Sequence, residues 1–256
     1  MGHTLNKRAH RKDLNMTWKS ILREFVPPII KKAIRPPSRG EGYISAPATI
    51  AAAHTAGLSV GDYVERLWQE PGGSASIIKR LREIGAISSA TKSVVEIGSG
   101  TGRYIEHMLK CCRPTVYQIY ETDDAWASWA AKSYPVEACA ADGRSLKSTK
   151  SNSTDLIHAH GVFVYLPFMI SYRYFKEIAR VAAPGAFVAF NICSEACFDT
   201  ETAEKWLASD HNWPCFLSTA LVRQFFDNNG FVFIESFLAP FDVGWSEYLI
   251  FRQPTA

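Results

Sequence analysis

The sequence VVEIGSGTGRYIEHM, at residues 94–108, changes its apolar pattern twice. It opens with a β-branched run, Val94, Val95 and Ile97, as a buried strand requires. Glycines then occupy every second position, at 98, 100 and 102. From residue 103 the apolar side chains recur at intervals of three and four, which indicates a helix. Strand, glycine turn and helix in this order predict the ligand-binding corner of an open α/β sheet.

The spacing of the glycines distinguishes two kinds of site. A dinucleotide fingerprint places its third glycine three positions after the second, which would suit an NAD-dependent enzyme. Here Gly102 follows Gly100 by two positions, and the acid Glu96 precedes Gly98 by two. The pattern Glu-x-Gly-x-Gly-x-Gly resembles the first motif of the class I S-adenosylmethionine-dependent methyltransferases. Taken alone, the motif also fits an ordinary strand-to-helix turn.

The resemblance extends over roughly residues 60–252 and implies a fold and a cofactor. The implied fold is a Rossmann-like, doubly wound α/β sheet of seven strands, mostly parallel with an antiparallel edge strand, behind an N-terminal helical extension. Residues 231–237 and 247–252 would form the antiparallel pair. The implied cofactor is S-adenosyl-L-methionine, with its methionine portion over Gly98, Gly100 and Gly102 and with Glu96 as a further cofactor-binding residue.

The chain is expected to divide into three parts. Residues 1–40 form a basic amphipathic arm that is partly disordered, residues 41–90 a helical cap segment, and residues 91–256 the cofactor-binding methyltransferase domain. Within the cap we expect helices over 46–57, 62–68 and 76–84, the second capped by Ser59 or Asp62. By resemblance such a segment shapes the acceptor pocket, so Tyr63, Glu65 and Trp68 are candidates, with surface or core positions as the alternative.

Two acidic positions follow the next strands. The second strand, 115–120, ends at Glu121, twenty-three residues after Gly98, where a carboxylate can accept both ribose hydroxyls. Asp123 competes for this role. Asp142-Gly143, after a third strand over 135–140, resembles the position at which the family holds the adenine amino group. A plain Asp-Gly turn is the alternative.

The fourth strand, from 155, ends at His160, where by resemblance a polar residue meets the cofactor. A neutral imidazole could take the proton of an acceptor hydroxyl as general base. His160 could equally contact the cofactor with no proton role. His158, inside the strand, is expected to be a buried, hydrogen-bonded core residue. Tyr165 falls where several relatives carry an acceptor-side residue.

The charge is unevenly distributed. The whole chain carries +3, but residues 1–40 hold ten Lys or Arg and two acids, a net +8, and the remainder carries a net −5. A basic groove for nucleic acid is therefore not expected on the main domain. The six cysteines lack metal-ligand spacing and no acidic metal cluster is apparent, so we expect no metal.

The arm admits two interpretations. In residues 16–40, Trp18, Ile21, Leu22 and Phe25 fall on one helical face amid basic residues, which suits an anionic membrane surface. The alternative is a helix packed on the body or on a second subunit. The longest apolar run, residues 25–30, is too short to span a bilayer. With no evident secretory signal, we expect a cytoplasmic protein, peripheral to the inner face of the membrane if the first interpretation holds.

The residues after the fourth strand bear on the acceptor. No Asn-Pro-Pro-Tyr or Asp-Pro-Pro-Tyr motif follows the fourth strand, which argues against adenine or glutamine N-methylation. Aromatic residues after that strand suit a sugar or a flat small molecule. We therefore predict O-methylation of a saccharide or other small-molecule acceptor. The alternatives are N- or C-methylation of a metabolite or lipid, and a non-catalytic module that binds the cofactor; the oligomeric state is not predicted.

Overall fold

The computed structural model describes residues 44–209, 211 and 213–255. The predicted arm, including the segment 16–40 assigned to membrane contact, lies outside the described residues. No helix within the described ranges is long and apolar enough to cross a membrane.

Three helices precede the sheet, as predicted. They are α3 (Ala46–Thr55), α4 (Val60–Leu67) and α5 (Gly73–Glu83). Ser59 caps α4 by accepting a hydrogen bond from the Asp62 N–H over 3.1 Å. Helix α5 begins earlier than the predicted residue 76, because Gly72 adopts a left-handed φ of 79° and the Glu65 carboxylate accepts from the first N–H groups of the helix.

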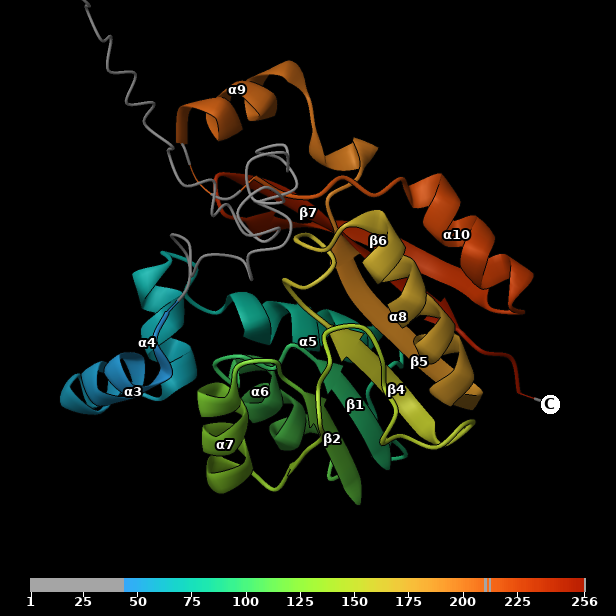
Figure 1. The fold of residues 1–256 in the computed structure, drawn as a ribbon, viewed down its shortest axis with the longest axis horizontal. Helices are drawn as coiled ribbons and strands as arrows, with labels where there is room; N and C mark the ends of the chain where they lie inside the picture. Colours follow the sequence, from blue (N-terminus) through green and yellow to red (C-terminus); the bar gives the residue numbers. More distant parts are fainter. Residues whose placement is uncertain (1–43, 210, 212, 256) are drawn as a thin grey trace, which may run out of the picture. The chain divides into compact units, whose positions relative to one another are not determined.

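The sheet has seven strands in the order β3-β2-β1-β4-β5-β7-β6 (Figure 1). The strands are β1 (Ser93–Ile97), β2 (Val116–Tyr120), β3 (Glu137–Ala138), β4 (Thr154–Ala159), β5 (Ala182–Ile192), β6 (Val232–Phe241) and β7 (Gly244–Arg252). The first five are parallel, and β7 runs antiparallel to both β5 and β6. The predicted antiparallel pair is confirmed, and within it the reversed strand lies one position in from the edge.

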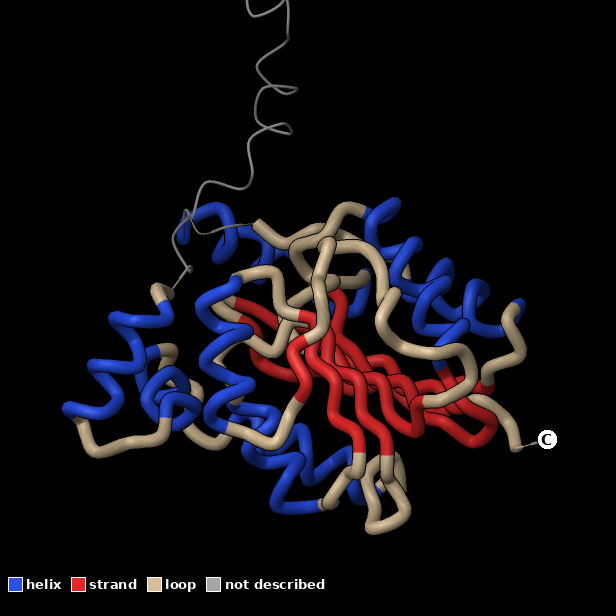
Figure 2. The backbone as a smooth tube through the Cα atoms, turned by 60° about the horizontal axis from the view of Figure 1, so that its bottom comes forward, coloured by secondary structure: helices blue, strands red, loops and turns tan. Residues whose placement is uncertain are grey.

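Helices cover both faces of the sheet (Figure 2). The remaining ones are α6 (Arg103–Cys111), α7 (Asp124–Ser133), α8 (Phe168–Val181), α9 (Thr200–Ser209) and α10 (Thr219–Asn228), with a 3₁₀ turn, η1 (Glu195–Cys197). Helices α8 and α10 pack their apolar side chains on one face, and α5, α6 and α7 pack on the other. The Rossmann-like doubly wound arrangement predicted from the glycine turn is thus confirmed.

Two strands differ from their predicted lengths. β3 keeps only two residues of the six predicted from 135 to 140. β5 begins at Ala182, so the Pro184-Gly185 step lies inside the strand and does not form a turn before it. A register shift between Thr154 and Leu156 of β4 accommodates this step, and the Gly185 N–H donates to the Gln253 carbonyl over 2.9 Å.

Candidate functional site

The glycine turn links β1 to α6 through three left-handed residues. The φ angles of Gly98, Gly100 and Gly102 are 69°, 45° and 70°. A Cβ on Gly98 would lie 2.5 Å from Val162 Cγ2, and one on Gly102 would lie 2.7 Å from the Tyr134 ring. A Cβ on Gly100 would meet nothing within 4 Å. Close packing therefore requires the outer glycines, and the middle one leaves its backbone open to a ligand.

Glu121 lies against this turn. Its Oε2 accepts a hydrogen bond from the Gly100 N–H over 2.7 Å, and its Oε1 accepts from the Asp123 N–H over 2.8 Å. Burial raises the pKa of Glu121. The carboxylate of Asp123 instead caps α7, accepting from the N–H groups of Ala125 and Trp126. Glu121 thus hydrogen-bonds to the glycine turn, and the Asp123 carboxylate caps the helix that follows.

Glu96 lies below the turn, inside the sheet. It is 2% exposed and pairs across the sheet with His158, and its carboxyl group accepts a hydrogen bond from the Tyr117 hydroxyl. Burial raises the pKa of Glu96 to about 8. Any effect of Glu96 on a ligand therefore passes through the strand that carries the turn, because its carboxyl group does not reach the surface.

Asp142 and Gly143 form a turn beside the tip of β2. The Asp142 carboxylate accepts from the N–H groups of Arg144 and Ser145 over 3.0 and 2.8 Å, and Gly143 has a φ of 71°. Burial opposes the ionisation of Asp142, but hydrogen bonds from Ser145, Arg144 and Lys147 together outweigh it and lower the pKa to about 2. A Cβ on Gly143 would lie 3.8 Å from the side chain of Thr122, so this turn lies next to Glu121.

His160 follows the last residue of β4 and is half-buried. Its Nδ1 is 2.6 Å from the Tyr248 hydroxyl, and its ring lies 4.6 Å from that of Tyr104, centroid to centroid. Burial lowers the pKa of His160 well below its usual range, and the nearby Arg103 and His158 add to this effect. The imidazole is therefore neutral at pH 7.

His158 is fully buried, as predicted for a core histidine. Its Nε2 lies 3.5 Å from the Tyr248 hydroxyl, whereas its Nδ1 has no hydrogen-bond partner among the described residues. Burial lowers the pKa of His158 to about 3. Tyr248 was not predicted from the sequence. It lies on β7, and an apolar strand pattern does not indicate which distant polar group a buried hydroxyl will meet.

Charged and aromatic side chains lie near Arg103, whose charge contributes to the lowered pKa of His160. The Arg103 guanidinium lies 3.8 Å from the Glu70 carboxylate and 4.9 Å from the centre of the Trp68 ring. Burial raises the pKa of Glu70, and burial together with the charges of Asp242 and Glu70 raises that of Tyr165. Arg103 also lies 5.3 Å from the centre of the Tyr104 ring, which packs against the ring of His160.

The three candidate pocket residues of the cap have different positions. Trp68 is exposed and lies under Arg103. Glu65 is buried and engaged with the start of α5. Tyr63 packs at the edge of a small apolar cluster that includes Val64 and Trp126. Of these three residues, Trp68 is the one that contacts Arg103, and Arg103 acts on His160.

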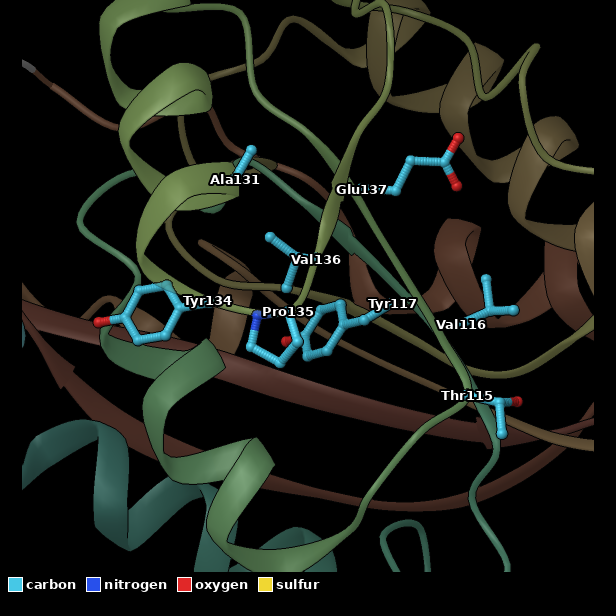
Figure 3. A pocket seen from close by; sticks show the side chains of 8 residues that line it. All are labelled: Thr115, Val116, Tyr117, Ala131, Tyr134, Pro135, Val136 and Glu137. Carbon is cyan, nitrogen blue, oxygen red and sulfur yellow. The ribbon is translucent and has the colours of Figure 1, made fainter.

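Two surface hollows lie away from these residues. One of about 370 Å³ is bounded by Thr115, Tyr117, Tyr134 and Glu137 (Figure 3). Another, of about 430 Å³, adjoins Lys92 and residues 109–113. Both lie at the amino ends of the parallel strands, whereas the glycine turn, Glu121 and His160 lie at the carboxyl ends. Ligands of open α/β sheets bind at the carboxyl ends, so we place the site there.

The residues at the carboxyl ends fit the S-adenosylmethionine that the sequence resemblance implies. The hydroxyl of Ser99, within the glycine turn, is buried and has no hydrogen-bond partner among the described residues. Gly100 is open on its Cα side, and Glu121 stands beside it. The turn therefore provides a hydroxyl without a partner and an open backbone, and the carboxylate predicted to bind ribose, that of Glu121, lies beside it. Within the described ranges no group of three or more His, Cys, Asp or Glu could hold a metal ion.

Comparison with known families agrees with this arrangement. The protein-family model described as a methyltransferase domain matches residues 65–236. The match covers more than half of the chain, and it includes the glycine turn, Glu121, Asp142 and His160. A search for similar curated proteins returns no match.

Solved methyltransferase structures share the fold. The methyltransferase of a Haloferax volcanii complex with the Trm112 activator is 15% identical, with a TM-score of 0.57 over 83% of this chain and 99% of that one. An O-methyltransferase family protein from Burkholderia thailandensis is 13% identical, with a TM-score of 0.57 over 77% and 60%. An S-adenosylmethionine-dependent methyltransferase from Mesorhizobium loti is 13% identical, with a TM-score of 0.52 over 68% and 96%.

Proposed function

Because the chain belongs to the methyltransferase domain family and uses S-adenosyl-L-methionine as its methyl donor, we propose that it methylates a hydroxyl oxygen of a saccharide or another small polar acceptor. The observation that carries the proposal is the protonation and the hydrogen bonding of His160. This imidazole is neutral and half-buried at the carboxyl end of β4, and its Nε2 has no hydrogen-bond partner among the described residues. A neutral imidazole with an unpaired nitrogen suits the removal of a hydroxyl proton.

Different residues of the chain would bind different parts of the cofactor. The glycine turn and Ser99 would hold the methionine portion, Glu121 the ribose hydroxyls, and Asp142 with Gly143 the adenine. When bound, S-adenosylmethionine supplies an activated methyl group on a sulfonium. The protein then has to align the acceptor oxygen with that methyl group and exclude water, which can contribute about 7–11 kcal/mol.

The surroundings of His160 favour a polar acceptor. Arg103 and Glu70 can donate or accept hydrogen bonds, and Tyr165, five residues after His160, is a large exposed aromatic side chain. A saccharide presents both hydroxyl groups and apolar ring faces, so it matches such a mixture. A purely apolar acceptor would make no hydrogen bonds with these charged groups.

The location and the division of the chain belong to the same proposal. Residues 91–256 would form the cofactor-binding domain, residues 41–90 its cap, and residues 1–40 a basic arm. We propose that residues 16–40 bring a cytoplasmic enzyme to an anionic membrane surface. Co-sedimentation with anionic liposomes should then fall when residues 1–40 are deleted, and unchanged co-sedimentation would leave the arm a structural role only.

The test of function compares turnover with cofactor binding. The protein is incubated with labelled S-adenosylmethionine and a panel of saccharides, amines and lipids, and the methylated atom is identified by mass spectrometry and NMR. His160→Gln should reduce turnover about 10²–10⁴-fold, the usual contribution of a general base, and should keep the affinity for S-adenosylhomocysteine.

Three outcomes of this test would contradict the proposal. Lost cofactor affinity in His160→Gln would make His160 a cofactor contact. Methylation at nitrogen or carbon alone would replace the O-methyl assignment. Tight cofactor binding without methylation of any acceptor class would favour a binding module.

A further inference from the structure

Asn191 lies near the carboxyl end of β5, on the strand next to the one that carries His160. The parallel pairing of β4 with β5 ends at Ala159 and Phe190. Asn191 therefore follows the last paired residue of β5, as His160 follows that of β4. On its other side Asn191 pairs with Tyr248 of β7. The register thus places His160, Asn191 and Tyr248 in one row across three neighbouring strands, at the sheet edge where we place the cofactor site.

The Asn191 side chain is fully buried and uses both of its polar atoms. Its Oδ1 accepts a hydrogen bond from the Gly161 N–H over 2.8 Å, and its Nδ2 donates to the Ser246 hydroxyl oxygen over 3.0 Å. Because a backbone N–H can only donate, the oxygen of the amide must face Gly161 and its NH₂ group must face Ser246. The two bonds therefore connect the chain that leaves β4 to the first residues of β7.

Gly161 directly follows His160 and turns the chain out of the sheet. Its φ is 68°, and its N–H lies beyond the last pair of the ladder between β4 and β5. Backbone N–H groups in a protein interior are nearly always paired, and here the Asn191 oxygen is the acceptor. A Cβ on Gly161 would meet nothing within 4 Å, so the turn is not packed on that side. The hydrogen bond to Asn191 therefore has a large share in fixing the peptide plane between His160 and Gly161.

His160 is thus held at two points. The Tyr248 hydroxyl lies 2.6 Å from Nδ1 of the ring, and Asn191 holds the peptide plane that follows the residue. That plane and the strand before it set the direction in which the Cα–Cβ bond leaves the backbone. The position of the imidazole therefore depends on the peptide plane as well as on the contact at its ring.

We propose that Asn191 is a positioning residue, which fixes the peptide between His160 and Gly161 and so aims the imidazole of His160 at the acceptor. The inference rests on the proposed function, because it assumes that His160 takes the acceptor proton. A misplacement of about 1 Å can cost about 10²-fold in rate, so a hydrogen bond that holds the backbone of the base is expected to affect turnover strongly.

The first test is kinetic. Asn191→Leu removes both hydrogen bonds with a side chain of similar size, and it should lower kcat about 10–100-fold with unchanged affinity for S-adenosylhomocysteine. Asn191→Asp keeps an oxygen for the Gly161 N–H and should recover most of this loss. Ser246→Ala is the matched control, because it removes the other hydrogen bond of the same amide and should leave kcat near the wild-type value. Unchanged kcat in Asn191→Leu, or an equal loss in Ser246→Ala, would overturn the inference.

A double-mutant cycle with His160→Gln separates positioning from a general loss of structure. If Asn191 acts through His160, Asn191→Leu should lower kcat in the wild type and cause no further loss in His160→Gln. Losses that multiply in the double variant would show that Asn191 acts elsewhere, and they would overturn the inference while leaving the proposed base in place. Full turnover of His160→Gln alone would overturn the proposed function, and the positioning role with it.

Hydrogen exchange of the full-length protein tests the geometry without any acceptor. The Gly161 amide, followed by NMR, should exchange slowly in the wild type and in Ser246→Ala, and faster in Asn191→Leu. Fast exchange in the wild type would overturn the inference even if Asn191→Leu failed to fold.

Discussion

Glu121 accepts a hydrogen bond from the backbone N–H of Gly100, with 2.7 Å between Oε2 and N. The bond joins the tip of β2 to the middle of the glycine turn. It forms because β1 and β2 are parallel neighbours, with Ile97 opposite Tyr120, so the residues that follow them meet at one sheet edge. The ribose-binding acid and the methionine-binding turn proposed for this site are therefore held together before any ligand arrives.

This relationship predicts the effect of Glu121→Gln. The variant keeps the shape of the side chain. It loses the negative charge, and an NH₂ group replaces one of the two oxygens that accept hydrogen bonds. Hydrogen bonds to charged groups contribute about 1.5–3 kcal/mol, so we expect the Kd for S-adenosylhomocysteine to rise about 10–100-fold by titration calorimetry. Asp123→Asn is the control, because asparagine also caps helices and the affinity should not change. The opposite result, with Asp123→Asn alone weakening binding, would transfer the ribose contact to Asp123.

A second prediction concerns Gly98 and Gly100. Alanine at either position meets a left-handed backbone, which costs about 1–2 kcal/mol. At Gly98 its Cβ also collides with Val162 Cγ2 at 2.5 Å, whereas at Gly100 it enters open space. In urea unfolding, Gly98→Ala should therefore lose more stability than Gly100→Ala, and the added Val162→Ala should restore part of it.

Gly100→Ala should mainly weaken cofactor binding, because its new methyl group occupies the open side of the turn. Equal stability losses in the two single variants would contradict the packing argument, and so would an absence of rescue by Val162→Ala.

The sequence predicts the fold well because its signals are local. The apolar run at 94–97, the glycines and the helical spacing after 103 each specify a short backbone segment, and parallel pairing then places the ends of the strands together. The same logic brings Glu121 to the turn. The sequence does not separate Glu121 from Asp123, because either acid suits that spacing; in the structure the Asp123 carboxylate caps α7.

Other parts depend on long-range contacts that have no local signal. Tyr248 reaches His160 from a strand eighty-eight residues later. In the sequence, Glu65 looks like an ordinary polar residue of a helix. In the structure its carboxylate caps the start of α5, because α5 begins next to α4. The Pro184-Gly185 step is typical of a turn, and the bulge opposite Thr154 allows β5 to begin before it. In each case tertiary packing overrides a local preference.

A third prediction is a pH dependence of stability due to Glu96. Its pKa is about 8 in the folded chain and near 4.5 when unfolded. Between these values the folded state binds one more proton, so stability falls as pH rises from about 4.5 to 8 and the penalty is constant above that. Tyr117, whose pKa burial raises well above 10, stays neutral throughout.

Glu96→Gln removes this titration. Urea unfolding at pH 5, 6.5 and 8 should show the wild type losing stability relative to the variant as pH increases. Other titrating groups are common to both proteins and cancel in the difference. A constant difference across this range would mean that Glu96 is ionised in the folded protein.

The last prediction assigns Glu65 to folding and not to the acceptor pocket. Its Oε2 accepts from the Gly72 N–H over 2.7 Å and its Oε1 from the Ser74 N–H over 2.8 Å. In Glu65→Gln one oxygen becomes an NH₂ group that faces an N–H, so a buried donor loses its acceptor at a cost of about 1–3 kcal/mol. Unfolding in urea should show this loss, whereas kcat and cofactor affinity should stay at wild-type values.

Glu83→Gln is the matched control on α5, where the carboxylate is exposed and its ion pairs are 3.7 and 3.9 Å long. Exposed pairs of this kind contribute about 0–1 kcal/mol, so the control should be nearly neutral. Reduced turnover of Glu65→Gln at unchanged stability would return Glu65 to the acceptor pocket. If Glu65→Gln loses stability without a kinetic effect, Trp68 remains the cap residue expected to face the acceptor. Its ring lies against Arg103, whose charge acts on His160.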